Sequence, residues 1–166
     1  MRIVERLDPT TLFARFQQDH DICYIGSALA CHRHCFLTAI DQSEFQRLLV
    51  NSSPQNLRPP IGSFPTIEEV VDQIRRQPTF LEQDSHERVL NGMKVKYYLE
   101  LLKHGSGLKE CFIRDKEQGM PEKGSYYVAD GMHSLVAYAL WTDLKADGFP
   151  VKLYLCTNSS LSIPAP

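Results

Sequence analysis

The chain has 166 residues, of which 43% are hydrophobic and 23% are charged, and its formal net charge at pH 7 is −2. This composition is typical of a globular domain and excludes a disordered or fibrous chain. Lysines and arginines form no run that could neutralise a nucleic-acid backbone, so direct DNA binding is disfavoured.

The N-terminal segment Met1–Asp8 lacks the uninterrupted apolar stretch of a signal peptide, and no later stretch approaches the length of a membrane span. We therefore expect a soluble, cytoplasmic protein that does not enter a membrane. The cysteines are odd in number and irregularly spaced, which argues against a disulfide scaffold and favours free thiols. They are Cys23, Cys31, Cys35, Cys111 and Cys156.

The first predicted element is a helix that begins at Asp8 and Pro9 and ends near His20. Asp8 is a favourable N-cap residue, and proline suits the first helical position. The run 22–25 is typical of a strand, and 35–40 is a second apolar run.

Ser43 can cap a further helix that continues through Val50. Residues 51–65 follow with four prolines and three serines, which predicts a flexible connection or lid. We expect a single domain over residues 1–166, within which residues 1–65 could form an N-terminal lobe.

Thr66 and Glu69 form a capping-box pattern, which predicts a helix to about Gln77. Residues 84–87 could cap a longer helix that Gly105 ends. The apolar stripe expected on that helix consists of Val89, Leu90, Met93, Tyr97, Leu101 and Leu102.

The most informative stretch predicts a strand that turns sharply into a helix. Residues 125–129 are rich in strand formers, Gly131 suits a tight turn, and the residues that follow repeat at helical spacing up to Gly148. The first amides of a helix can hold a phosphate or carboxylate. Asp130, His133 and Ser134 would surround that anion. A strand over 110–114, a polar loop over 117–124 and a closing strand over 151–156 complete the predicted order.

The segment Asp130-Gly131-Met132-His133-Ser134 resembles the signature turn of the ParB/sulfiredoxin-like fold family. The order of the predicted elements over residues 84–157 is similar to the layout of that family. The resemblance implies an α+β fold, with a small mixed sheet, packed helices and an N-terminal helical extension. In this comparison residues 84–157 are the ParB-like core.

The resemblance also implies a protein that binds nucleotides or other phosphorylated small molecules, with Gly131, Met132 and Ser134 at the ligand. Asp130 and His133 would be catalytic residues of a phosphotransferase or phosphohydrolase that uses Mg²⁺ with ATP, ADP or CTP. Met132 stands where sulfiredoxins have a catalytic cysteine, which argues against that activity. Ser134 replaces the usual phosphate-binding arginine, so the rival interpretation is a catalytically silent binding or protein-interaction module. The pattern does not indicate an oligomeric state.

The segment Cys31-His-Arg-His-Cys35 contains residue types that bind zinc, but neither helical nor strand spacing brings all four ligands to one face. We therefore expect no metal site there. As an alternative, His32, Arg33 and His34 could line the cleft opposite the signature turn, with Arg33 as the missing cation.

Carboxylates precede the long helix, and kinases of this fold class use such a carboxylate to deprotonate a hydroxyl substrate. Glu82 or Glu87 could take this role, and we place Glu87 with the candidate catalytic residues. The alternative is a solvated helix start, where acidic residues are ordinarily favoured. An aromatic cluster is expected to pack in the core and at its rim rather than to form a platform that stacks on bases. Its members are Tyr97, Tyr98, Tyr126, Tyr127, Tyr138 and Trp141.

Overall fold

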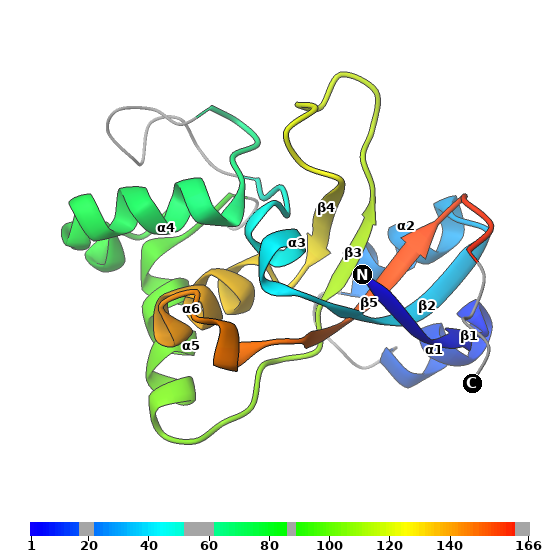
Figure 1. The fold of residues 1–166 in the computed structure, drawn as a ribbon, viewed down its shortest axis with the longest axis horizontal. Coiled ribbons are helices and arrows are strands. Elements are labelled where there is room, and N and C mark those ends of the chain that lie inside the picture. The colour runs from blue at the N-terminus through cyan, green and yellow to red at the C-terminus, as the bar shows by residue number, and fades with distance from the viewer. Residues whose placement is uncertain (17–21, 52–61, 86–88, 162–166) are drawn as a thin grey trace.

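The computed structural model describes residues 1–16, 22–51, 62–85 and 89–161, with no side-chain description for 22–24. The chain folds as an α+β protein around one five-stranded mixed sheet, with strand order β1-β2-β5-β3-β4 (Figure 1). The strands are β1 (Arg2–Leu7), β2 (His34–Ile40), β3 (Phe112–Asp115), β4 (Tyr126–Asp130) and β5 (Val151–Thr157). Only the β3–β5 pair is parallel among these strands, and the other neighbours run antiparallel.

Six α-helices are present in the described residues, together with the short 3-10 helices η1 (Pro78–Glu82) and η2 (Ala146–Gly148). They are α1 (Pro9–Phe16), α2 (Ile22–Cys31), α3 (Gln42–Gln46), α4 (Ile67–Arg76), α5 (Gly92–Lys103) and α6 (Met132–Thr142). In Figure 1, α4, α5 and α6 gather at the left, and α1 and α2 lie at the right. No helix in the described parts of the chain is long and apolar enough to cross a membrane.

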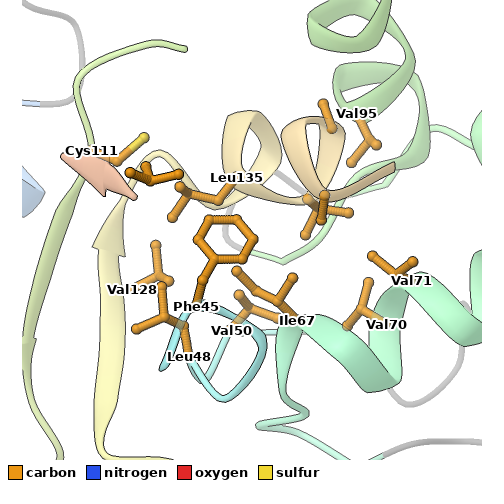
Figure 2. Close-up of a cluster of buried hydrophobic side chains, with 14 of the residues drawn as sticks. Phe45, Leu48, Val50, Ile67, Val70, Val71, Val95, Cys111, Val128 and Leu135 are labelled. Carbon is orange, nitrogen blue, oxygen red and sulfur yellow. The ribbon is translucent and has the colours of Figure 1, made fainter. Parts of the chain in front are cut away.

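Successive strand residues point to opposite sides of the sheet, and hydrophobic clusters with helices cover both faces. On β3, Phe112 belongs to a cluster with α1 and α2, whereas its neighbour Ile113 belongs to the larger cluster with α3 to α6. Figure 2 shows the larger cluster, with Phe45 between Leu135 of α6 and Ile67 of α4. The sheet is therefore a shared layer between two hydrophobic clusters.

Several predicted elements are confirmed. Asp8 caps α1, since its Oδ2 accepts hydrogen bonds from the backbone amide of Thr11 at 2.8 Å and from its hydroxyl at 2.7 Å. The capping box of Thr66 and Glu69 starts α4, and Gly105, with φ of 86°, follows α5. The polar loop joins β3 to β4 as predicted.

The strand prediction for residues 22–25 is wrong, because these residues begin helix α2. Ile25, Ala28 and Leu29 are buried at helical spacing, so the apolar run belongs to a helix that packs on the sheet. Strand β1 was not among the predicted elements. Its alternation is weak, because this edge strand has one buried side chain, Ile3.

The boundaries of three helices also differ from the predictions. Helix α3 is capped by Asp41 rather than Ser43 and ends at Gln46, because residues 48–50 turn away to bond with β4 and with Pro65 and Ile67. Helix α6 ends at Thr142, before Gly148, as Asp143 takes a left-handed conformation.

Helix α5 begins at Gly92, with Asn91 as its N-cap, and thus starts later than predicted. The predicted stripe on α5 is also wrong in part. Met93 and Tyr97 are 53% and 61% exposed, whereas Val95 and Leu102 are buried.

Most of segment 51–65 lies outside the described residues, but its two ends are held side by side. Val50 donates its amide proton to the carbonyl of Pro65, and Ile67 donates to the carbonyl of Leu48, both at 2.9 Å. Strands β1 and β2 from the N-terminal part share the sheet with β3, β4 and β5.

Candidate functional site

The predicted strand-to-helix corner is confirmed at Gly131. Strand β4 ends at Asp130, Gly131 has φ of 87°, and α6 begins at Met132. A Cβ atom on Gly131 would lie 2.4 Å from Sγ of Cys111, so both the backbone angle and the packing require glycine. The corner is thus fixed by a contact that the local sequence does not reveal.

The first turn of α6 opens toward a cleft. The first backbone hydrogen bond of the helix runs from the amide of Leu135 to the carbonyl of Gly131 at 2.9 Å, so the amides of residues 132–134 precede it. Such amides carry the positive end of the helix dipole. Gly131, Met132 and His133 all line the adjoining cavity.

This cavity has a volume of about 470 Å³, which is within the range of small-molecule sites. Its walls come from α2, α5, β3, β4 and the start of α6. It combines charged and aromatic side chains, and those that matter below are Lys94, Tyr97, Tyr98, Arg114, Tyr127, Asp130 and His133.

Two cations belong to the lining. Lys94 is exposed on the first turn of α5. Arg114 lies on β3, where its guanidinium carbon is 5.0 Å from the ring centroid of Tyr127 and its Nη2 is 2.5 Å from Oε1 of Glu117. Two basic side chains therefore line the same cleft as the first residues of α6. Sequence reasoning missed both residues, although strand alternation places Arg114 on the side of β3 opposite Ile113.

His133 links α6 to the start of α5. Its Nε2 atom accepts a hydrogen bond from the backbone amide of Asn91 at 3.0 Å. A backbone amide can only donate, so Nε2 carries no proton and the imidazole is neutral, with its proton on Nδ1. Asn91 in turn caps α5, since its Oδ1 accepts from the amide of Lys94 at 3.1 Å. His133 thus supports the wall of the cleft and lines it.

Asp130 is largely buried at the end of β4, with 8% exposure, and its Oδ2 is 3.9 Å from Nζ of Lys109. Burial first, and then the charge of Asp130, raise the pKa of the neighbouring Cys111 thiol far above its ordinary value. The thiol of Cys111 donates to the carbonyl of Lys109 at 3.0 Å. Cys111 is therefore an inert packing residue.

Ser134 is placed differently from the other residues of the signature. Ser134 is 2% exposed and lies beside the thiol of Cys111. It belongs to the packing behind Gly131, and only its backbone amide is directed toward the start of the helix.

The structure does not bring Arg33 to the corner. Arg33 precedes β2, and its amide donates to Oδ1 of Asn158 at 3.1 Å. His34, the next residue, pairs with Thr157 at the end of β5, whereas Asp130 pairs with Phe112 at the start of β3. Phe112 is level with Tyr154 in the middle of β5, and β5 and β3 separate β2 from β4. Arg33 therefore lies away from Asp130 and does not line the cleft. Glu87 lies outside the described residues, and Glu82 pairs with Lys96 at 2.6 Å.

The segment 31–35 is divided between two elements. Cys31 ends α2 and is exposed, whereas Cys35 is buried on β2 and faces Cys156 with the two Sγ atoms 3.9 Å apart. His32 donates from Nδ1 to the carbonyl of Ala28 at 2.6 Å, and Nδ1 of His34 accepts from Arg6 at 3.2 Å. Over the described residues, no group of three or more His, Cys, Asp or Glu side chains is arranged to hold a metal ion.

No family model matches the chain, and neither a curated protein nor a solved structure is detectably similar to it. The fold and the cleft define an α+β protein with a cationic and aromatic cavity at the start of a helix.

Proposed function

We propose that the cleft binds a phosphorylated small molecule or nucleotide through the first turn of α6, Lys94 and Arg114. The observation that supports this most directly is the cavity of about 470 Å³, which joins the start of α6 to both cations. A helix start and basic side chains are complementary to phosphate, and each reinforces the other in a partly enclosed site.

Arg114 is the residue best suited to replace the arginine that the family signature would have at Ser134. A guanidinium offers a planar, doubly donating group that matches phosphate, which a serine hydroxyl cannot. In the structure the guanidinium stacks on Tyr127 and pairs with Glu117, so its orientation is already restricted. The side chain is 22% exposed, which reduces the cost of removing it from water when a ligand binds.

The wall that α5 contributes to the cleft is aromatic. Tyr97 and Tyr98 have ring centroids 5.3 Å apart and lie beside Lys94 on α5. Aromatic rings can stack on a nucleobase, so a nucleotide such as ATP, ADP or CTP would place its phosphates at α6 and its base along α5.

A magnesium ion fits this arrangement through Asp130. Mg²⁺ is commonly held by one or two carboxylates together with ligand phosphates and water. Among the described residues that line the cleft, Asp130 is the carboxylate, so it would contribute the protein ligand. The ion would supply charge neutralisation of the phosphates.

We also propose that the chain is a distant member of the ParB/sulfiredoxin-like class. In support, α5, β3, β4, α6 and β5 follow one another in the order that the resemblance implied. Gly131 makes the strand-to-helix corner in a left-handed conformation. A cytoplasmic location, where nucleotides are abundant, belongs to the same proposal.

Phosphotransfer or phosphohydrolysis is the reaction to test, with Asp130 and His133 as the catalytic residues. The alternative is a silent binding module, which two observations favour. Nε2 of His133 is committed to the amide of Asn91, and the carboxylate of Asp130 lies largely buried beside Lys109. Both side chains consequently have structural roles that would remain in a protein without catalytic activity.

Calorimetric titration with pyrophosphate, ADP, ATP and CTP, with and without Mg²⁺, tests the proposal. Replacing Lys94 with glutamine should weaken binding about tenfold, the effect expected from losing one charge-assisted hydrogen bond. Lys96→Gln is the matched control, because Lys96 lies on the same helix and pairs with Glu82 outside the cleft lining. Equal affinity of the two variants, or no binding by the wild type, would reject the cleft as a phosphate site. Release of phosphate during the titration would distinguish an enzyme from a silent module.

A further inference from the structure

Cys35 and Cys156 face each other across the antiparallel strands β2 and β5. They are direct partners in the register of the two strands, and their Sγ atoms lie 3.9 Å apart. Their exposures are 1% and 0%. Neither residue lines the cleft, so the proposed binding function does not account for the pair.

The backbone geometry at this position suits a disulfide. Residues directly opposite each other in an antiparallel pair have Cα atoms about 4.5 or 5.5 Å apart. Disulfides ordinarily join Cα atoms separated by about 4.4–6.8 Å. Side-chain rotation with a small strand adjustment can therefore bring the two sulfur atoms to bonding distance.

We propose that Cys35 and Cys156 form an oxidation-sensitive dithiol, which a small peroxide converts to a disulfide that ties β2 to β5. A peroxide is the chemical class that fits the burial of the pair, because hydrogen peroxide is close to water in size. A bulky disulfide oxidant would have to reach sulfur atoms covered by α1 and α2.

The two thiols differ in their readiness to react. The hydrogen bond between the two thiols lowers the pKa of Cys35, whereas the same bond and burial raise the pKa of Cys156. Cys35 is consequently the first to form a thiolate, which is the nucleophilic form.

The reaction balances with one molecule of hydrogen peroxide. The Cys35 thiolate attacks one peroxide oxygen, the O–O bond breaks, and the departing hydroxide takes the thiol proton as water, which leaves a sulfenic acid on Cys35. The sulfur of Cys156 then attacks the sulfur of Cys35, the S–O bond breaks, and the second hydroxide leaves with the Cys156 proton as water. Two thiols are oxidised to one disulfide, and one peroxide is reduced to two waters.

The other described cysteines differ from this pair. Cys31 is exposed at the end of α2, and Cys111 is fully buried in the larger cluster at the Gly131 corner. A Cys31→Ser background removes the exposed thiol, which would otherwise react with peroxide or join two chains.

The full chain in this background is treated with hydrogen peroxide, its remaining thiols are alkylated without reduction, and it is digested with trypsin. Cleavage after Arg33, Arg47 and Lys152 gives peptides 34–47 and 153–166, which carry Cys35 and Cys156 separately. We expect mass spectrometry to find these two peptides joined, with a mass two hydrogen atoms below their sum. Dithiothreitol should separate them.

Cys35→Ala and Cys156→Ala each have to abolish the joined species, while Cys111→Ala should retain it. The oxidised chain should also unfold at a temperature at least about 4 °C higher, because the link closes a long loop in the unfolded state. Two results would overturn the pairing. Either the thiols of Cys35 and Cys156 are both still alkylated after peroxide treatment, or one of them forms a disulfide with another cysteine. An unchanged or lower unfolding temperature after complete joining would show that the link is damage rather than a built-in state.

Discussion

Two five-residue segments, 130–134 and 31–35, each concentrate polar and reactive side chains, but the fold treats them in opposite ways. In the first, a left-handed glycine lets the chain turn sharply from β4 into α6, so Asp130 and His133 line one cleft. In the second, α2 ends and β2 begins, so Cys31 faces solvent while Cys35 enters the core. Proximity in sequence becomes a site only where the backbone turns residues toward a shared cavity.

Replacing Gly131 with alanine should produce the largest effect, because this residue makes the corner. A left-handed non-glycine residue is strained, and the new Cβ would stand 2.4 Å from Sγ of Cys111. We expect a loss of unfolding free energy of about 3 kcal/mol or more, measured by urea denaturation. Gly105→Ala is the matched control, since Gly105 has nearly the same φ of 86° and its new Cβ would meet no atom within 4 Å. It should cost only about 1 kcal/mol. Equal costs at both glycines would refute the packing role of Cys111.

Serine substitutions at the two ends of segment 31–35 should differ sharply. Cys35→Ser places a hydroxyl in a core position that is 1% exposed, and it should cost about 2 kcal/mol of unfolding free energy. Cys31→Ser is exposed and should change stability by less than about 0.5 kcal/mol. Parallel denaturation curves measure both values. Similar costs would mean that the segment does not divide between α2 and β2 as described.

His133→Ala should cost about 1–2 kcal/mol, because the amide of Asn91 loses the acceptor that it has in the folded state. His133→Gln should recover part of the loss, since a side-chain carbonyl can accept the same hydrogen bond. The measurement is again urea denaturation, at pH 8 so that histidine is neutral. If the alanine variant is as stable as the wild type, the link between α5 and α6 is not needed to hold the cleft.

The smallest expected effect concerns Tyr154 on β5, the strand that pairs with β2. Burial and a hydrogen bond to Glu110 raise the pKa of Tyr154 to about 12. The protonated Tyr154 hydroxyl therefore stabilises the folded state. Its contribution is complete below about pH 10, the pKa of an unfolded tyrosine, and is lost as the pH rises toward 12. Tyr154→Phe should cost about 1 kcal/mol at neutral pH and should remove that part of the alkaline loss. Identical pH profiles of variant and wild type would contradict the assigned pKa.

The sequence was most informative where one local interaction decides the structure. The capping box of Thr66 and Glu69 was predicted because it depends on two residues three positions apart. The turn at Gly131 was predicted from the strand and helix patterns on its two sides, whereas the contact with Cys111 that also fixes it was not. Residues 22–25, at the start of α2, were predicted as a strand from four residues alone, whereas packing of the helix against the sheet decides their conformation.

The candidate site was predictable only in part, for a similar reason. Gly131, Met132 and His133 lie within one motif, but Lys94 and Arg114 come from two other elements and meet only when α5 packs on α6 and β3 pairs with β4. Ser134 was predicted as a ligand-binding residue because its position on the helix was known while the packing of Cys111 behind it was not. Contacts between residues far apart in the sequence cannot be predicted from the spacing of residues in a single sequence.

The most direct test of the central claim is a pyrophosphate titration of isotope-labelled protein, followed by amide resonances in two-dimensional NMR spectra. If the start of α6 and the two cations hold the anion, saturable shifts should concentrate at Gly131, Met132, His133 and Lys94, while the amides of residues 31–35 stay unchanged. Shifts centred on residues 31–35, or no saturable shift at the start of α6, would contradict the account.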